Sequence, residues 1–263
     1  MEITGYSASI LIGISLGLIG GGGSILTVPV LVYLFTVDTV LATTYSLFVV
    51  GSTSLVGSFS YFKKGLIAVK TAIFFGIPSI IAVSLTRQYL LPSIPEYLIN
   101  FGNFALTRSV LLMLLFAFLM MIASYSMIKK ETEEQSASHQ PSSSIWVIAQ
   151  GIMVGIVTGL IGAGGGFLII PALVNLLKLP MKTAIGTSLI IIAVNSLIGF
   201  VFSLRQSQIN WSFLLTVTLI AIVGIFIGSY LSTKIDGKKL KPAFGWFVLV
   251  MGIYILLKET ILK

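Results

Sequence analysis

The stretch GISLGLIGGGGS at residues 13–24 decides the fold, because it recurs as GIVTGLIGAGGG at residues 155–166. A shift of 142 residues aligns the two copies without a gap, and the match continues beyond the glycines, where Pro29 meets Pro171. About 20 of roughly 55 aligned positions are identical, which is too many for two unrelated apolar stretches. Glycine-interrupted hydrophobic segments at matching positions of two repeats indicate the substrate site of a secondary transporter.

The composition places the chain in a lipid bilayer. Hydrophobic residues make up 56% of the 263 residues and charged residues only 9%, whereas a soluble domain carries about 25% charged residues. There is no cysteine and a single histidine, His139, so neither a metal site nor a cofactor is expected. The net charge of +8 is spread over Lys and Arg residues between apolar runs, which is typical of membrane topology and argues against nucleic acid as a partner.

Nothing in the sequence indicates an enzyme. It contains no G-x-S-x-G, H-E-x-x-H or carboxylate pair, and its glycine tracts lack the Lys-Ser/Thr ending of a P-loop. No acidic residue lies plainly within an apolar run, so a carboxylate proton relay lacks a candidate.

The apolar runs divide the chain into two similar halves. They cover residues 5–37, 41–62, 66–86 and 106–128, and then 145–177, 183–204, 210–233 and 243–258. Arg87 is read as the end of the third run, and the stretch 88–103 after it as an exposed or interfacial loop. The polar stretch 129–144 is expected to be a flexible linker between a first repeat, 1–128, and a second repeat, 145–263.

The runs 5–37 and 145–177 are too long for one membrane crossing of about 20 residues and too short for two. Glycine in a helix interior costs about 1 kcal/mol per residue. We therefore expect each run to form two half-helices that meet at a glycine-rich break, with 24–35 and 167–177 as the second halves. Non-helical backbone at membrane depth, as in such a break, is tolerated only where it is buried in protein or lines a cavity.

The basic residues favour one of two topologies. Eight crossings would divide the 16 Lys and Arg residues evenly, whereas re-entrant runs 5–37 and 145–177 leave six crossings and place 11 basic residues on one side. The other five are Arg87, Arg108, Arg205, Lys258 and Lys263. Because basic residues gather on the cytoplasmic face, we predict six crossings, termini outside and the linker in the cytoplasm. The alternative, in which both runs span the membrane, stays open.

The predicted fold class is therefore an all-α polytopic membrane protein of two inverted repeats. Each repeat contains a Gly-broken, re-entrant helix pair plus three transmembrane helices. Inverted repeats suit alternating access around a midplane site.

The breaks and the hydroxyls that follow them predict an anion site. Glycines let the backbone approach a ligand, consecutive N–H groups form an anion-binding nest, and neutral hydroxyls can replace water around an oxyanion. The expected substrate-binding residues are Gly21, Gly22, Gly23, Ser24, Ser46, Gly164, Gly165, Gly166, Thr187, Ser188 and Asn195. The alternatives are close helix packing for the glycines and hydrogen bonding within or between helices for the hydroxyls.

The paired tracts GLIGGGGSILTVPVL and GLIGAGGGFLIIPAL, followed by ATTYS and AIGTS, resemble the TauE/SafE family. This family is also called the sulfite exporter or toluene-sulfonate uptake permease family. The second copy fits the pattern better, since the first departs from it at Ser24 and at Thr44-Tyr45. The resemblance implies transport of sulfur-containing anions such as sulfite, sulfoacetate or related organosulfonates, and it favours export.

The expected function is thus secondary transport of a small sulfur oxyanion or sulfonate across the cell (inner) membrane by a multi-pass protein. Its expected partners are the substrate and the lipid bilayer, and a homodimer is left open. An anion channel of the same architecture and a non-transporting membrane assembly factor are the alternatives. The sequence does not distinguish among candidate anions, directions or coupling ions.

Overall fold

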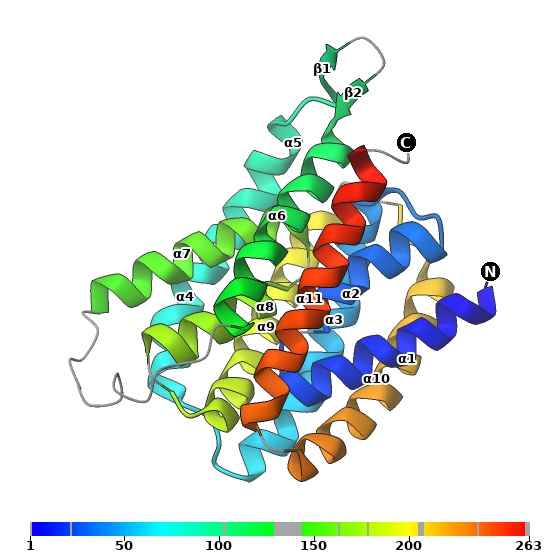
Figure 1. The fold of residues 1–263 in the computed structure, drawn as a ribbon. Coiled ribbons are helices and arrows are strands. Elements are labelled where there is room, and N and C mark those ends of the chain that lie inside the picture. The colour runs from blue at the N-terminus through cyan, green and yellow to red at the C-terminus, as the bar shows by residue number, and fades with distance from the viewer. Residues whose placement is uncertain are drawn as a thin grey trace.

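The structure, a computed structural model, is almost entirely helical (Figure 1). It describes residues 2–21, 23–101, 104–128, 144–162, 164–177, 179–204, 208–235 and 237–260. Of the predicted linker, only Ser144 lies within the described residues, as the first residue of a helix.

Two series of helices follow each other along the chain. The first half contains α1 (Glu2–Ile19), α2 (Ser24–Pro29), the π-helical turn η1 (Val30–Leu34), α3 (Thr39–Lys63), α4 (Val69–Leu85), the π-helical turn η2 (Thr86–Leu90), α5 (Leu91–Ser93), β1 (Tyr97–Phe101), β2 (Phe104–Thr107) and α6 (Arg108–Ile128). The second half contains α7 (Ser144–Ile161), α8 (Gly166–Pro171), η4 (Ala172–Leu176), α9 (Met181–Ser203), α10 (Trp211–Lys234) and α11 (Gly237–Thr260). The shift of 142 residues maps the ends of α1, α2 and η1 onto those of α7, α8 and η4.

Both long apolar runs break at their glycines, as predicted. Gly20 has a φ of 78°, and in the second break Gly162, Gly164 and Gly165 have φ values of 72°, 66° and 68°. This left-handed backbone is open to glycine and strained for other residues. The glycines therefore end one helix and let the next begin in a new direction.

The second helix of each break changes its hydrogen-bond pattern after a proline. Pro29 ends α2 and Pro171 ends α8, and a π-helical turn follows each of them. Proline supplies no backbone N–H, so the regular i→i−4 ladder is interrupted there. The N–H of Phe35 then bonds to the carbonyl of Val30, five residues back.

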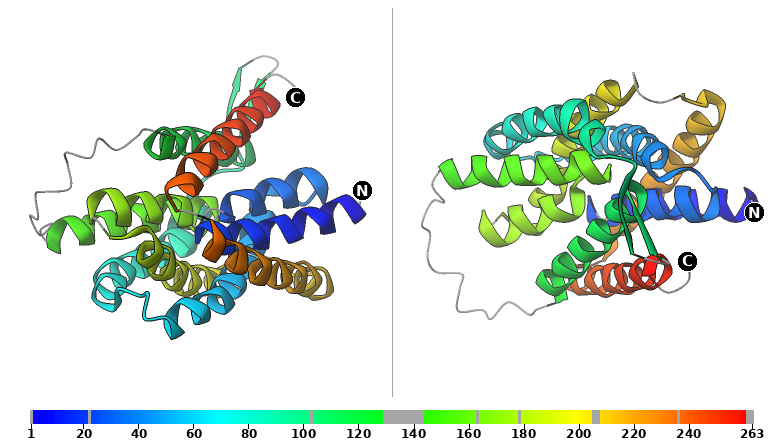
Figure 2. Two further views of the ribbon diagram at one scale, coloured as in Figure 1. Left: turned by 60° about the horizontal axis from the view of Figure 1, so that its bottom comes forward. Right: turned by 90° about the horizontal axis from the view of Figure 1, so that it is seen from above.

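The helices on either side of the first break run antiparallel. The rings of Tyr6, near the start of α1, and Phe35, after η1, lie edge to face with centroids 5.4 Å apart. α1 and α2 lie on the side of the N-terminus, and α7 and α8 lie on the opposite side (Figures 1 and 2). Two helical hairpins therefore reach the middle of the molecule from opposite sides.

The two halves are packed in the same way. α1 packs along α10 and α7 along α4, while α3 packs on α9 and α6 on α11. Gly13 of α1 contacts the carbonyl of Ala221, and at the equivalent place Gly155 of α7 contacts the carbonyl of Ser79. Small residues allow this close approach of membrane helices.

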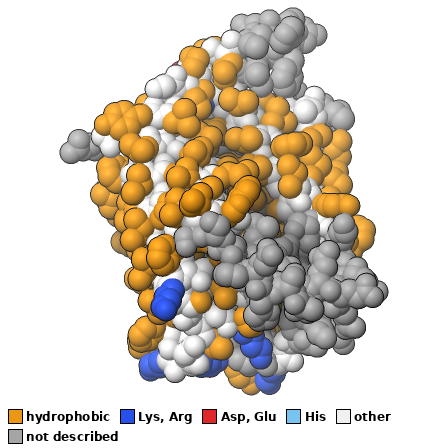
Figure 3. Space-filling view, turned by 90° about the vertical axis from the view of Figure 1, so that its left-hand side faces the viewer, with side chains coloured by type: hydrophobic (Ala, Val, Ile, Leu, Met, Phe, Trp, Pro, Cys, Tyr) orange, Lys and Arg blue, Asp and Glu red, His pale blue; other side chains and the backbone are white. Residues whose placement is uncertain are grey.

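Five helices among the described residues are long and apolar enough to cross a membrane. They are α3, the continuous segment Val69–Ser93, Arg108–Tyr125, α9 and Trp211–Ser232. All five fall on predicted crossings, and α11, with 24 residues, falls on the sixth. On the side of the molecule shown in Figure 3, hydrophobic side chains cover much of the described surface, and Lys and Arg side chains gather towards one end. The protein is an all-α polytopic membrane protein.

The expectation for the stretch after residue 86 is wrong. The third run does not end at Arg87, because the helix continues through η2 and α5 to Ser93. The rest of the expected loop includes β1, which pairs antiparallel with β2 from Tyr97 opposite Thr107. The misreading has a physical cause: Arg87 is buried inside the protein, so its charge does not mark the membrane surface.

Candidate functional site

The two helix breaks meet in the middle of the molecule. Gly21 of the first break and Gly166 of the second lie backbone against backbone, and a Cβ on either one would collide with the main chain of the other. The contact brings predicted site residues from both halves together. Gly22, also predicted for the site, lies outside the described residues.

An arginine that the sequence reading placed at a membrane surface lies against the second break. Arg87 is 1% exposed, and its Nη1 donates a hydrogen bond to Thr43 Oγ1 over 3.1 Å. Its Nε and Nη2 have no hydrogen-bond partner. A Cβ on Gly162 would lie 2.6 Å from Nη2, so the guanidinium directly faces the glycine break.

Within the described residues, no carboxylate partner accounts for the buried guanidinium. The buried carboxylate of Glu259 accepts a hydrogen bond from Tyr33 Oη over 3.0 Å instead. A buried charge without a partner costs several kcal/mol, and each buried donor left without an acceptor costs about 1–3 kcal/mol. A bound anion would remove this penalty, and the planar guanidinium is suited to two parallel hydrogen bonds to an oxyanion.

Two buried hydroxyls face the same break. Gly164 contacts Ser196, and Gly165 contacts Thr158. The hydroxyl oxygens of Ser196 and Thr158 have no hydrogen-bond partner, although both side chains are buried. Gly162, Gly164 and Gly165 are therefore in contact with one cation and two neutral hydroxyls.

The predicted serine pair behaves asymmetrically. Ser46 and Ser188 are repeat mates, and both are fully buried. Ser188 Oγ donates to the carbonyl of Ile185 over 2.8 Å, whereas Ser46 Oγ has no partner. Of these two serines, therefore, only Ser46 has a hydroxyl proton that is not already donated to its own helix.

The other predicted hydroxyls and the amide mostly hold the scaffold together. Ser24 Oγ donates to the carbonyl of Gly21 over 2.6 Å, and Thr187 Oγ1 accepts from the N–H of Ala68 over 2.9 Å, just before α4. Asn195 Nδ2 donates to Ser79 Oγ over 2.6 Å and so links α9 to α4, which leaves its Oδ1 without a partner.

Among the described residues, a buried charge lies at only one of the two equivalent places. Thr43 contacts Gly162 of the second break, while its repeat mate Ile185 contacts Gly20 of the first. Arg87 corresponds to Ser229 in the second half. The packing is shared by the two halves, but the charge is not, so we place the candidate site at the second break.

The chain is similar to probable membrane transporter proteins along nearly its whole length. The profile of the family described as sulfite exporter TauE/SafE matches residues 6–255. A probable membrane transporter protein of Xylella fastidiosa (strain Temecula1) is 29% identical over 252 residues, which cover 94% of this chain and 91% of the relative. The probable membrane transporter protein YunE of Bacillus subtilis is 28% identical over 256 residues, which cover 91% of this chain and 89% of YunE. No solved structure matches the chain.

Proposed function

Because the chain belongs to the sulfite exporter TauE/SafE family of membrane transporters, we propose that it carries a small sulfur-containing oxyanion, such as sulfite or an organosulfonate. The proposed mode is secondary transport across the cell membrane. The proposed direction is export, and it rests on the family's description alone.

The observation that carries the proposal is the buried guanidinium of Arg87. It lies against Gly162, with Nε and Nη2 free to donate. A single guanidinium matches an anion of one net charge, and the hydroxyls of Thr158 and Ser196 can donate to further oxygens of the same anion. Hydrogen bonds from a charged donor are roughly twice as strong as those between neutral groups.

The arrangement of the helices supports alternating access as the mechanism. The two broken runs are proposed to be re-entrant hairpins from opposite membrane sides, which makes the two halves inverted repeats. Their tips touch at Gly21 and Gly166, and this contact would close a path that runs between the two sides at this point. This closed contact favours a carrier over an open anion channel.

The test is anion-dependent thermal stability of the purified protein. Sulfite at 100 times its Kd should stabilise the native state by about 2.7 kcal/mol, and a panel of sulfate, thiosulfate, sulfoacetate, taurine and carboxylates would rank the substrates. Arg87→Met should abolish this stabilisation. Without anion, the variant should be at least as stable as the unaltered protein, because an unpaired buried charge has been removed.

Arg108→Met is the matched control. Arg108 begins α6, and its Nη1 contacts the carbonyl of Ile94 over 3.4 Å, near the β1–β2 hairpin. Its replacement should leave the sulfite-dependent stabilisation in place. If Arg87→Met retained the full stabilisation, or lost stability without anion while still responding to it, the arginine would be structural and the proposed site would be refuted.

Reconstituted vesicles separate the proposed carrier from a channel. A carrier should show sulfite flux that saturates and should exchange labelled for unlabelled sulfite in counterflow. Flux that rises without saturation, and shows no counterflow, would identify the channel instead.

A further inference from the structure

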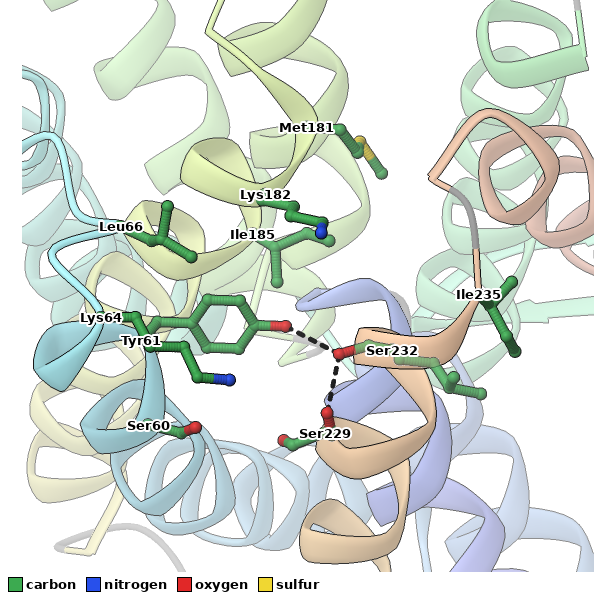
Figure 4. Close-up of a pocket in the computed structure, with 11 residues that line it drawn as sticks. Ser60, Tyr61, Lys64, Leu66, Met181, Lys182, Ile185, Ser229, Ser232 and Ile235 are labelled. Carbon is green, nitrogen blue, oxygen red and sulfur yellow. Dashed lines mark hydrogen bonds between the residues drawn. The ribbon is translucent and has the colours of Figure 1, made fainter.

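A cavity with both polar and apolar walls lies between α3, α9 and α10. Its volume is about 100 Å³, and its polar lining residues are Ser60, Tyr61, Lys64, Lys182, Ser229 and Ser232 (Figure 4). None of the described residues that line it is acidic. The two lysines therefore give the cavity a positive potential, which raises the local concentration of anions.

The lysines come from different halves of the chain. Lys64 directly follows α3, and Lys182 lies in the first turn of α9. Both side chains are exposed, so their ammonium groups remain hydrated. A hydrated ammonium on a flexible stem suits brief capture of an anion, whereas the rigid, buried fork of Arg87 suits a more specific site.

The position of this cavity in the repeat links it to the first break. Ser229 and Ile185 line it, and these are the repeat mates of Arg87 and Thr43. Ile185 in turn packs on Gly20 of the first break. The cavity therefore abuts the first break as the Arg87 site abuts the second, and Gly21 and Gly166 meet between them.

A chain of hydrogen bonds from Tyr61 through Ser232 to Ser229, here called the strap, crosses the cavity. Tyr61 Oη and Ser232 Oγ lie 3.1 Å apart, and Ser232 Oγ also donates to the carbonyl of Ser229 over 2.9 Å. Figure 4 shows the Tyr61 ring reaching from α3 to α10, with the ammonium groups of Lys64 and Lys182 on either side of it. The Ser229 hydroxyl oxygen below the strap is buried without a partner.

We propose that this cavity is a second anion-binding station, a vestibule that collects the oxyanion on the predicted cytoplasmic side before it reaches Arg87. The inference rests on the proposed function for the nature of its ligand. The ammonium groups attract the anion, and the hydroxyl of Ser229, which is buried without a partner, provides a neutral donor. The station increases the rate of capture and leaves affinity at the Arg87 site unchanged.

The experiment compares Lys64→Gln/Lys182→Gln with Lys63→Gln in vesicles of pure phosphatidylcholine, with radiolabelled sulfite as the probe. Lys63 is a matched control, because it also lies at the end of α3 but stacks on the Phe59 ring, 4.5 Å from its centroid. The double variant should raise the KM for sulfite by about three- to tenfold at low ionic strength, since steering by charge depends on salt. The maximal rate should stay unchanged, and the difference in KM should shrink in about 1 M salt, where the Debye length is about 3 Å.

Two further measurements make the outcome decisive. The sulfite Kd from thermal stabilisation should change less than about twofold in the double variant, because Arg87 is intact. Repeating the flux in vesicles with phosphatidylglycerol tests whether the lysines serve lipid phosphate instead: an effect on KM seen only with this anionic lipid overturns the proposal. The proposal is also overturned if Lys63→Gln raises the KM for sulfite as much as the double variant does. If the double variant does not fold, Lys182→Gln alone takes its place.

Failure here is distinguishable from failure of the site at Arg87. If Arg87→Met kept its response to sulfite while the double lysine variant still raised KM, the vestibule would stand and the central site would not. If the double variant left the KM unchanged while Arg87→Met lost its response to sulfite, the central site would stand and the vestibule would not.

Discussion

Arg87 and Ser229 occupy equivalent positions of the two repeats, yet only Arg87 lies in a π-helical turn. α10 remains α-helical through Lys234, whereas α4 gives way to η2 at Thr86. Single π-helical turns inside α-helices are frequent at functional sites. The same scaffold therefore presents a guanidinium to one break and a small hydroxyl to the cavity beside the other, so matched substitutions in the two halves should have unequal effects.

Thr43→Val should weaken sulfite binding by about threefold to tenfold. The change removes the acceptor that orients Nη1 of Arg87, while the Thr43 hydroxyl otherwise donates only to the carbonyl of Val40. Net hydrogen-bond contributions are about 0.5–1.5 kcal/mol. The control is Thr44→Val, because Thr44 also bonds to the Val40 carbonyl. Equal Kd values for the two variants, from thermal stabilisation, would contradict a positioning role for Thr43.

Gly162→Ala and Gly165→Ala should stop transport, whereas Gly65→Ala should not. All three glycines have positive φ, so each alanine introduces backbone strain of about 1–2 kcal/mol. Only at Gly162 and Gly165 does a Cβ also collide with neighbours, Thr43 and Thr158 respectively, since nothing lies within 4 Å of a Cβ on Gly65. The measurement is sulfite flux per folded protein. Gly65→Ala reports the effect of backbone strain alone, and the other two variants report strain and collision together. Normal flux in Gly162→Ala would show that the break does not need its bare backbone.

Ser46→Ala should reduce sulfite affinity by about tenfold to a hundredfold, the equivalent of a hydrogen bond to a charged group of about 1.5–3 kcal/mol. Ser188→Ala should change it little, because its proton is already donated to Ile185. The double variant should then resemble Ser46→Ala. A strong effect of both single changes that does not add in the double variant would instead support two serines sharing one anion.

Single cysteines can test the six-crossing topology, since the chain contains no natural cysteine. Ser138→Cys in the linker should resist an impermeant thiol reagent in intact cells, because the linker is predicted to be cytoplasmic. Ser93→Cys, at the exposed end of α5 and on the predicted outer side, should react. Labelling of Ser138→Cys in intact cells would refute this topology.

The helix breaks could be predicted from sequence because glycine acts locally. Four consecutive glycines at 20–23 disfavour a helix whatever surrounds them, and their recurrence fixed the ends of the half-helices to within a few residues. The roles of Ser46 and Ser188 could not be predicted in the same way. Whether a serine bonds to its own helix or keeps its proton depends on packing, which is not local.

Arg87 was misplaced although the repeat contained a signal for it. A charge after an apolar run is usually a membrane-surface residue, and that rule placed Arg87 at a helix end. Its repeat mate, Ser229, lies before the end of the apolar run 210–233. Aligning the two runs would have placed position 87 within a span, where an ionisable residue is a functional-site candidate by default.

In the proposed carrier, the contact between Gly21 and Gly166 also sets a limit on how fast an anion can pass. A barrier made of side chains can open by a rotamer change within picoseconds to nanoseconds. Here the barrier consists of two main chains without side chains, so nothing at that point can swing aside. Opening requires the hairpins themselves to separate, and collective helix motions take microseconds to milliseconds. The proposed transport cycle is therefore expected to turn over no faster than whole helices move.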